Sequence, residues 1–315
     1  MTSTTPSSLN LRRKQIILRR QSAYCYEALT ASVTAGSKIQ SRKRTMPDLI
    51  EAINLYKIFA TPVGDVHAVN GLSLNVKSGE VFGLLGANGA GKTTTLRMIL
   101  GLMKPTTGKA SVAGFDAATQ PEQVKRSVAL VSASAGLYQW LSPRELMHYF
   151  ADLYDVADHA AQQRVELLTK LFDLREFIDR PCSGLSTGQQ QRVNLARSLM
   201  HDPPVVLMDE PTRGLDIVGS KRIFDFTARL KEMGKAVIFC THRLEEAQRL
   251  CDRFGLMFRG RLQLQGTLTE LREKSGRDSI TDIFLDLMQE NDSTTEESMQ
   301  PQPVVTVPKR EGRSA

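Results

Sequence analysis

A ten-residue stretch, GANGAGKTTT, begins at Gly86, at the end of the apolar run VFGLLG. It satisfies the phosphate-loop pattern G-x-x-x-x-G-K-[ST], in which successive backbone N–H groups turn inward around a nucleotide's β-phosphate. Lys92 would neutralise charge on the β- and γ-phosphates, and the Thr93 hydroxyl would ligate Mg²⁺. The residues expected to bind the phosphates are Gly86, Ala87, Asn88, Gly89, Ala90, Gly91, Lys92, Thr93 and Thr94.

Polar side chains that could act on the phosphates follow two later apolar stretches, PVVLMDE (204–210) and KAVIFCTH (235–242). Asp209 can hold Mg²⁺, directly or through water, and Glu210 can polarise an attacking water. An acid pair at a strand end is by itself usually a solvated turn, but a phosphate loop earlier in the chain favours chemistry. His242 should emerge at the same sheet edge, near the γ-phosphate, where its ring can donate a hydrogen bond.

A second candidate phosphate site lies in LSTGQQQR, residues 185–192. Ser186 and Gln189 fit a capping box, Gly188 permits close backbone approach, and an amphipathic run follows. This pattern predicts a helix whose N-terminal N–H groups attract a phosphate. The chain therefore carries two candidate phosphate sites.

The elements that position these residues alternate between strand and helix. Runs at LIEAINLYKIF and GLSLNVKSGEVFGLLG are β-like, a helix is expected from about Lys92 to Met103, and FGLMFRGRLQLQGT is typical of a hairpin. Residues of about 135–185 have helical periodicity, with a capping box at Ser142. We predict an α/β fold: a phosphate-loop core with a parallel sheet, an N-terminal antiparallel β subdomain and an inserted helical subdomain.

Composition separates three regions of the 315 residues. Residues 1–45 hold nine lysines and arginines against one glutamate, so the net charge of +7 becomes −1 for the remainder. The remainder thus has no basic footprint for nucleic acid, and no run is long and apolar enough to span a bilayer. The four cysteines show neither C-x-x-C pairing nor metal-ligand spacing, which favours a reduced, cytosol-facing protein.

The boundaries expected from composition are 1–46 for a basic extension, 47–290 for the nucleotide-binding domain and 291–315 for a polar, disordered tail. Three interpretations of the extension stay open. It is a transit peptide, a stretch upstream of a true start at Met46, or a disordered basic arm; organellar targeting is not the favoured one.

The motifs GANGAGKT, LSTGQ, LMDEP and RGLD and the histidine at 242, in this order, resemble the nucleotide-binding subunit of an ATP-binding-cassette (ABC) transporter. The resemblance covers about residues 47–290, and LSTGQ is its family-specific element. GLYQWLSPRE and ITDIFLDLMQE are similar to the exporter subclass with separate membrane subunits, which includes sodium-efflux and multidrug types.

The resemblance implies a function for the second phosphate site. In this family two cassettes pack head to tail around two ATP molecules, and the signature of one cassette completes the site of the other. The signature residues would be Leu185, Ser186, Thr187, Gly188 and Gln189, with Asp216 in the loop between the sites and Phe59 stacked on adenine. A homodimer is expected, with a heterodimer as the alternative.

The same resemblance implies ATP hydrolysis that drives separate membrane permease subunits, for export, with Lys92, Glu210 and His242 as catalytic residues. The chain would then sit at the cytoplasmic face of the inner or plasma membrane through its permease. One departure is Ala133, where the family usually places a glutamine that touches Mg²⁺. The alternatives are a soluble ABC ATPase acting on the ribosome or DNA, and a regulatory cassette with little turnover.

Overall fold

The computed structural model describes residues 47–132 and 136–298, without side chains beyond residue 289. The chain divides into Met1–Thr45 and Met46–Ala315, and the fold below belongs to the second unit. Position 133 and the expected N-terminal extension lie outside the described residues.

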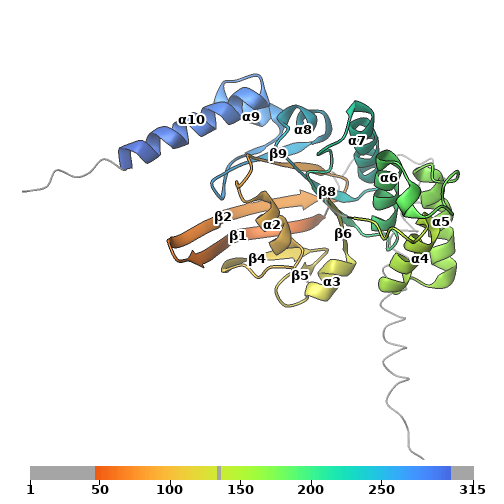
Figure 1. Cartoon of the computed structure of the whole chain (residues 1–315). Coiled ribbons are helices and arrows are strands. Elements are labelled where there is room, and N and C mark those ends of the chain that lie inside the picture. Colours follow the sequence, from red (N-terminus) through yellow and green to blue (C-terminus); the bar gives the residue numbers. More distant parts are fainter. Residues whose placement is uncertain (1–46, 133–135, 299–315) are drawn as a thin grey trace, which may run out of the picture. The chain divides into compact units, whose positions relative to one another are not determined.

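Two sheets make up the β-structure (Figure 1). The first is four-stranded and antiparallel, in the order β2-β1-β4-β5. Its strands are β1 (Asp48–Thr61), β2 (Gly64–Lys77), β4 (Thr107–Val112) and β5 (Phe115–Asp116). The β-like runs expected before residue 77 therefore form one long hairpin, β1 with β2.

The second sheet is six-stranded, in the order β10-β9-β3-β8-β7-β6. Five of its strands are parallel neighbours, and β10 pairs antiparallel with β9 as the predicted hairpin. The strands are β3 (Val81–Leu85), β6 (Val128–Ser132), β7 (Val205–Asp209), β8 (Ala236–Thr241), β9 (Arg253–Phe258) and β10 (Arg261–Gly266). The predicted parallel α/β core is confirmed.

Helices cover both faces of this sheet, which is why its central strands are apolar except at the carboxyl ends of β7 and β8. On β7, Val206 and Met208 face one core cluster while Val205 and Leu207 face the other. One cluster includes α2 (Lys92–Ile99) and the antiparallel sheet, and α3 (Pro121–Arg126) lies beside β5 and β6. The other joins α7 (Ile217–Glu232) to the helices between β6 and β7.

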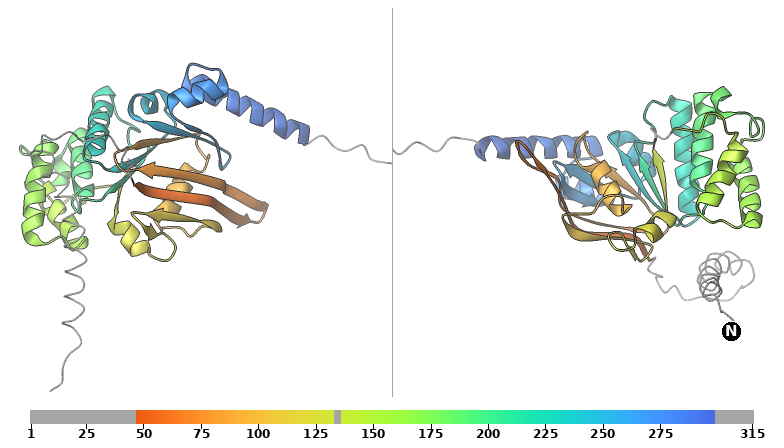
Figure 2. Two further views of the ribbon diagram at one scale, coloured as in Figure 1. Left: turned by 180° about the vertical axis from the view of Figure 1, so that it is seen from behind. Right: turned by 60° about the horizontal axis from the view of Figure 1, so that its bottom comes forward.

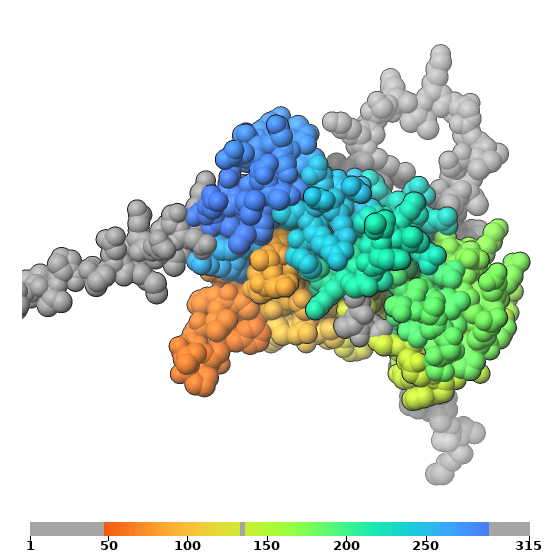
Figure 3. All heavy atoms as spheres, turned by 45° about the horizontal axis from the view of Figure 1, so that its top comes forward, coloured from red at the N-terminus to blue at the C-terminus, as the bar shows by residue number. Residues whose placement is uncertain are grey.

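The helices between β6 and β7 are here called the helical subdomain. They are α4 (Pro143–Leu153), α5 (Asp158–Leu171), the short 3₁₀ helix η1 (Cys182–Gly184) and α6 (Thr187–Ser198). Figure 2 shows these helices side by side along one edge of the sheets, and the space-filling view of Figure 3 shows them as a lobe next to α7.

The C-terminal part of the unit forms a smaller core of its own. Its helices are α8 (Leu244–Leu250), α9 (Leu268–Ser275) and α10 (Ile280–Ser298), which pack buried residues on Leu85 and β9. Helix α10 continues to Ser298, past residue 290, where the sequence placed the start of a disordered tail.

One helix is shorter than expected. The helix after the phosphate loop ends at Ile99 rather than near Met103. Gly101 adopts a left-handed φ of 68°, and the N–H groups of Leu102 and Met103 both return to the carbonyl of Arg97. A glycine in this conformation ends a helix, so Gly101 is the stop signal.

Candidate ATP site

The carboxyl ends of the parallel strands align at one edge of the second sheet. Leu85 of β3 is in register with Thr241 of β8, and Asp209 of β7 is in register with both Cys240 and Ser132. Ligands bind in α/β sheets at this edge, in the crevice beyond the strand ends. The phosphate loop, the two acids and His242 are therefore brought to one place although the chain separates them widely.

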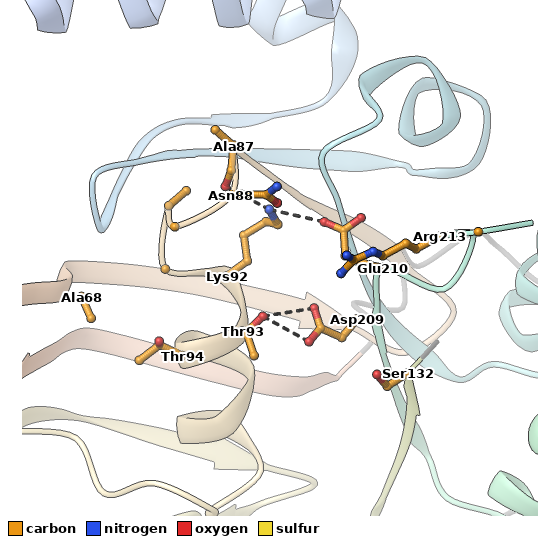
Figure 4. Close-up of a pocket in the computed structure, with 14 residues that line it drawn as sticks. Ala68, Ala87, Asn88, Lys92, Thr93, Thr94, Ser132, Asp209, Glu210 and Arg213 are labelled. Atoms are coloured by element: carbon orange, nitrogen blue, oxygen red, sulfur yellow. Dashed lines mark hydrogen bonds and ion pairs between the residues drawn. The ribbon is translucent and has the colours of Figure 1, made fainter. Parts of the chain in front are cut away.

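A cavity of about 570 Å³ opens at this edge and is called the phosphate cavity below (Figure 4). Its lining includes residues 87–94, Asp209 and Glu210, all of them predicted from the sequence. Gly86 contributes through its carbonyl oxygen, which accepts a hydrogen bond from Lys92. The volume is within the range of small-molecule sites.

The phosphate loop needs glycine where it turns into α2. Gly91 caps this helix with a left-handed φ of 105°. A Cβ atom at this position would collide with the carbonyl oxygen of Ala68 on β2. Only glycine combines this φ with so close a backbone approach, so the helix N-terminus can face the cavity.

Lys92 is buried at the base of the loop and points its ammonium toward the acids. Its Nζ donates to the carbonyls of Gly86 at 2.7 Å and Ala87 at 3.2 Å, and lies 3.5 Å from Glu210 Oε1. Thr93, the next residue, places its hydroxyl 3.1 Å from Asp209 Oδ2 and 3.3 Å from Oδ1. A hydroxyl and a carboxylate side by side form an oxygen donor set of the kind that Mg²⁺ prefers.

Glu210 occupies a strained backbone position between the loop and His242. Its φ is +49°, which a side chain other than glycine rarely adopts, and its N–H donates to the carbonyl of Cys240 at 3.0 Å. The Nδ1–H of His242 donates to Glu210 Oε2 at 2.8 Å. Within the described residues, the other oxygen of Glu210 is buried without a hydrogen-bond donor. A carboxylate held in this way can accept a hydrogen bond from water.

Cys240 lies on the neighbouring strand, behind the two acids. Burial raises the pKa of its thiol well above the usual value, and the negative charge of Asp209 acts in the same direction. Cys240 is therefore a neutral, buried thiol and not a nucleophile. The reactive groups of the cavity are the ammonium of Lys92 and the carboxylates.

Four residues of the cavity lining were not predicted: Ala68, Ser132, Arg213 and Gly214. Ala68 comes from the β2 strand and approaches because of the hairpin packing, which no local pattern reveals. Arg213 and Gly214 follow Glu210 within one turn, so their proximity to a predicted catalytic residue was a signal available in the sequence.

The signature residues lie apart from this cavity. Residues 185–189 are absent from its lining, and Thr187 instead lines a second cavity, of about 270 Å³, between α6, β6 and α7. Ser186 caps α6 through the predicted capping box: its Oγ accepts from Gln189 N–H at 3.3 Å, and Gln189 Oε1 accepts from Ser186 N–H at 2.9 Å.

Two further predicted residues have local contacts. Asp216 caps α7, where its Oδ1 accepts from the N–H of Gly219 at 2.7 Å. Phe59 lies on β1, 38% exposed, with the Lys57 ammonium 5.2 Å from its ring centroid, and it does not line the phosphate cavity. Adenine stacking on Phe59 and a loop role for Asp216 stay predictions.

Fold and site together define a class: an α/β phosphate-loop nucleoside triphosphatase. Residues 69–213 match the family model described as ABC transporter. The ABC transporter ATP-binding protein NatA of Bacillus subtilis (strain 168) is 41% identical over 221 residues, which cover 70% of this chain and 90% of that protein. The chain belongs to the ATP-binding subunits of ABC transporters.

Other relatives agree with this family. The linearmycin resistance ATP-binding protein LnrL of the same organism is 33% identical and is covered over 74% of its length, with 75% of this chain. The solved structure of an ATP-binding subunit of an ABC transporter aligns with a TM-score of 0.69 at 28% identity, covering 76% of this chain and 99% of that one. The structure of a dimeric bacterial ABC transporter cassette aligns with a TM-score of 0.61 at 26% sequence identity. The alignment covers 69% of this chain and 98% of that one.

These relatives also decide between the functions left open by the sequence. The chain is an ABC ATPase cassette, with ATP and Mg²⁺ as its ligands. The matches give no support to a soluble ATPase of the ribosome or DNA.

Proposed function

We propose that this chain hydrolyses ATP in the phosphate cavity and that hydrolysis drives export through membrane subunits encoded as separate chains. The observation that supports the site is the convergence of Lys92, Glu210 and the Thr93–Asp209 pair in one cavity. An ammonium, a carboxylate with one oxygen that accepts no hydrogen bond from the described residues, and a magnesium-type donor pair are the groups that phosphoryl transfer to water needs.

In this proposal, the backbone N–H groups of residues 86–91 and the ammonium of Lys92 hold the β- and γ-phosphates. Thr93 and Asp209 would hold Mg²⁺, which when bound would neutralise charge on the phosphates. The Thr93 hydroxyl and Asp209 Oδ2 lie 3.1 Å apart, so the two oxygen donors are already close together.

Glu210 then orients a water molecule and accepts its proton at Oε1, the oxygen that lacks a hydrogen-bond donor among the described residues. His242 fixes the other oxygen at 2.8 Å and so determines the direction of the first. The strained φ of Glu210 supports this role, since such backbone conformations cluster at functional sites.

The position of the signature residues supports assembly with a second cassette. Residues 185–189 do not line this chain's own phosphate cavity, yet Ser186 presents a capped helix N-terminus of the kind that binds phosphate. We propose a head-to-tail homodimer in which this N-terminus reaches the γ-phosphate bound by the partner copy. Loss of the bridging γ-phosphate on hydrolysis would then open the pair.

Attachment to the membrane is proposed to occur through the permease, at the cytoplasmic face. In the part of the chain that the structure describes, no helix combines the length and apolarity needed to cross a bilayer. Relatives named for linearmycin and daunorubicin resistance support the export direction. A heterodimer with a different cassette is the alternative partner.

Glu210→Gln tests the proposal directly, because the amide keeps the shape of the side chain but cannot accept the proton. We expect ATP hydrolysis by the purified chain with its membrane partners to fall by about 100-fold or more. Nucleotide binding should persist, and the variant should elute as an ATP-bound dimer on size-exclusion chromatography.

Glu232→Gln, at the C-terminal end of α7 and outside the cavity, is the matched control and should behave as the parent. Unchanged hydrolysis by Glu210→Gln would exclude Glu210 as the base. A hydrolysis-deficient variant that stays monomeric with ATP would argue against the head-to-tail pair.

A further inference from the structure

Arg213 is a cationic residue of the phosphate cavity to which the sequence assigned no role. It lies in the turn after β7, three residues beyond Glu210, and lines the phosphate cavity together with Lys92. Figure 4 shows its side chain extending from this turn toward the cavity, on the side of Glu210.

The backbone that carries Arg213 is held on both sides. The N–H of Arg213 donates to the carbonyl of Glu210 at 3.1 Å, and Glu210 is tied in turn to Cys240 on β8. The adjacent Thr212 is buried, and its hydroxyl donates to Glu246 of α8 at 2.6 Å. Because the turn is anchored to two elements, the base of the Arg213 side chain stays at the cavity rim.

The guanidinium itself has no hydrogen bond or ion pair with any residue that the structure describes, whereas Arg243, close by, pairs with Glu246 at 2.9 Å. An exposed arginine without a partner is common on a surface. Arg213 differs because it lines the phosphate cavity beside two carboxylates and pairs with neither of them.

The net charge of the side chains that line the phosphate cavity favours a phosphate-binding role for the Arg213 guanidinium. Without Arg213, the lining carries the two carboxylates of Asp209 and Glu210 against the ammonium of Lys92, which is a net charge of −1. The ammonium of Lys92 is already 3.5 Å from Glu210 Oε1, so that carboxylate offsets part of its positive charge. A nucleoside triphosphate stays anionic even with the Mg²⁺ that Thr93 and Asp209 would hold, so it is better balanced when a second cation of the protein faces it.

The second cavity shows where Arg213 sits relative to the rest of the fold. Ser132, Arg213 and Gly214 line both cavities, so they separate the phosphate cavity from the space beneath α6. Arg213 therefore lies at the boundary of the phosphate cavity on the side of Glu210 (Figure 4), which is the residue that the proposed function places beside the terminal phosphate.

We propose that Arg213 binds the terminal phosphate of ATP in its own chain and thereby makes the site select ATP over ADP. The proposal rests on the function proposed for the cavity. A guanidinium can donate two parallel hydrogen bonds to one phosphate, which a lysine ammonium cannot reproduce in the same geometry.

The test is equilibrium binding of an uncleavable ATP analogue and of ADP, both with Mg²⁺, to the full chain. Protein concentrations are kept low enough that the chain is monomeric. We expect Arg213→Ala to weaken binding of the analogue about 10-fold and to leave ADP binding within 2-fold, with Arg213→Lys intermediate. Arg175→Ala, an exposed arginine in the helical subdomain, is the control and should change neither affinity.

Two results would overturn the proposal. Equal weakening of ATP-analogue and ADP binding would mean that Arg213 does not reach the terminal phosphate. Unchanged binding with loss of the nucleotide-dependent dimer would place the Arg213 contact on the partner copy instead. Lys92→Ala separates this from a failure of the cavity assignment, because a Lys92 variant that still binds both nucleotides would refute the cavity itself.

Discussion

Glu210, the residue directly after β7, has a constrained backbone and a constrained side chain. A left-handed backbone at a residue other than glycine costs about 1–3 kcal/mol. Glu210 keeps this conformation because its N–H is tied to β8, and its two carboxylate oxygens face Lys92 and His242. The strain fixes the direction of the carboxylate before any substrate binds.

From its hydrogen bond to Glu210 we predict that His242 positions this carboxylate, whereas the sequence alone predicted a hydrogen bond from its ring to the γ-phosphate. We expect His242→Ala to lower kcat for ATP by about 10- to 100-fold with little change in KM, since the catalytic carboxylate remains but loses its fixed direction. His242→Gln keeps an N–H donor and should recover part of kcat. Steady-state ATPase assays on the complex with its membrane partners provide both constants.

His159→Ala supplies the control, because His159 is exposed on α5 and its ring contacts only Gln163, one helical turn away, among the described residues. A rise in KM with unchanged kcat would contradict the positioning role of His242 and point to direct nucleotide binding.

The chemistry of the site was largely predictable at this scale, because each key residue is marked by its own short pattern. Lys92 and Thr93 follow glycines at fixed spacing, and Glu210 and His242 end apolar runs. Ala68 and Ser132 reach the cavity only through packing of distant strands, which local patterns do not encode. Arg213 is close to Glu210 in the sequence, which was one indication that it lies near the site. An arginine in a turn is common, however, and only the structure shows that this side chain points toward the cavity.

Two helices of the helical subdomain begin with the same device. Ser142 and Ser186 both form complete capping boxes, with Glu145 and Gln189 respectively. Each box satisfies two N–H groups that an α-helix leaves without partners. The same capping box therefore begins α4, whose N-terminus has only a structural role, and α6, whose N-terminus is proposed to bind a phosphate.

A comparison of alanine variants at Ser142 and Ser186 can separate an effect on helix stability from an effect on ATPase function. Ser142→Ala and Ser186→Ala should each lower the free energy of unfolding by about 1 kcal/mol, the usual value of an N-cap, as measured by urea denaturation. Only Ser186→Ala is expected to reduce ATPase activity and nucleotide-dependent dimerisation in addition. If both variants lose activity to the same extent, the effect is one of helix stability and the proposed contact in the partner's site is wrong.

Element boundaries show where sequence patterns stop being sufficient. The capping boxes and the hairpin of β9 with β10 were predicted because they depend on neighbours in the chain. The end of α2 was expected near Met103, whereas the helix ends at Ile99, just before Gly101 adopts a left-handed conformation. The order of strands in the second sheet depends on contacts between distant residues, such as Val81 with Val237. The sequence therefore predicted that the sheet is parallel but not the order of its strands.

At the scale of the whole molecule, a partly buried polar cluster links the helical subdomain to the sheet. Asp202 accepts from Lys235, before β8, at 2.7 Å and pairs with Arg164 of α5 at 2.5 Å. The adjacent His201 stacks on Tyr154, at the end of α4, with ring centroids 3.8 Å apart. The Nε2–H of His201 donates to the carbonyl of Val128 on β6 at 3.1 Å.

This cluster makes the fold sensitive to acid. Burial lowers the pKa of His201 from 6.5 to about 4, and the nearby cations Lys235 and Arg164 act in the same direction. Its Nδ1 is buried without a hydrogen-bond partner in the described part of the chain, so protonation there would create an unpaired donor. Below pH 6.5 the unfolded chain takes up a proton that the folded chain refuses, and the stability from this residue is lost progressively down to about pH 4.

The difference between the pKa of His201 in the unfolded and in the folded chain corresponds to a loss of up to about 3 kcal/mol in the free energy of unfolding. His201→Gln keeps a donor for the Val128 carbonyl but does not titrate, so its stability should fall less steeply between pH 6.5 and 4.5. The Gln variant is expected to be about 1 kcal/mol less stable than the parent at pH 7.5 because the ring stack is lost. This deficit should shrink or reverse at pH 4.5, as followed by urea denaturation across the pH range. Parallel pH curves for the two proteins would show that His201 titrates freely in the folded state, and that the polar cluster does not couple acid to the attachment of the helical subdomain.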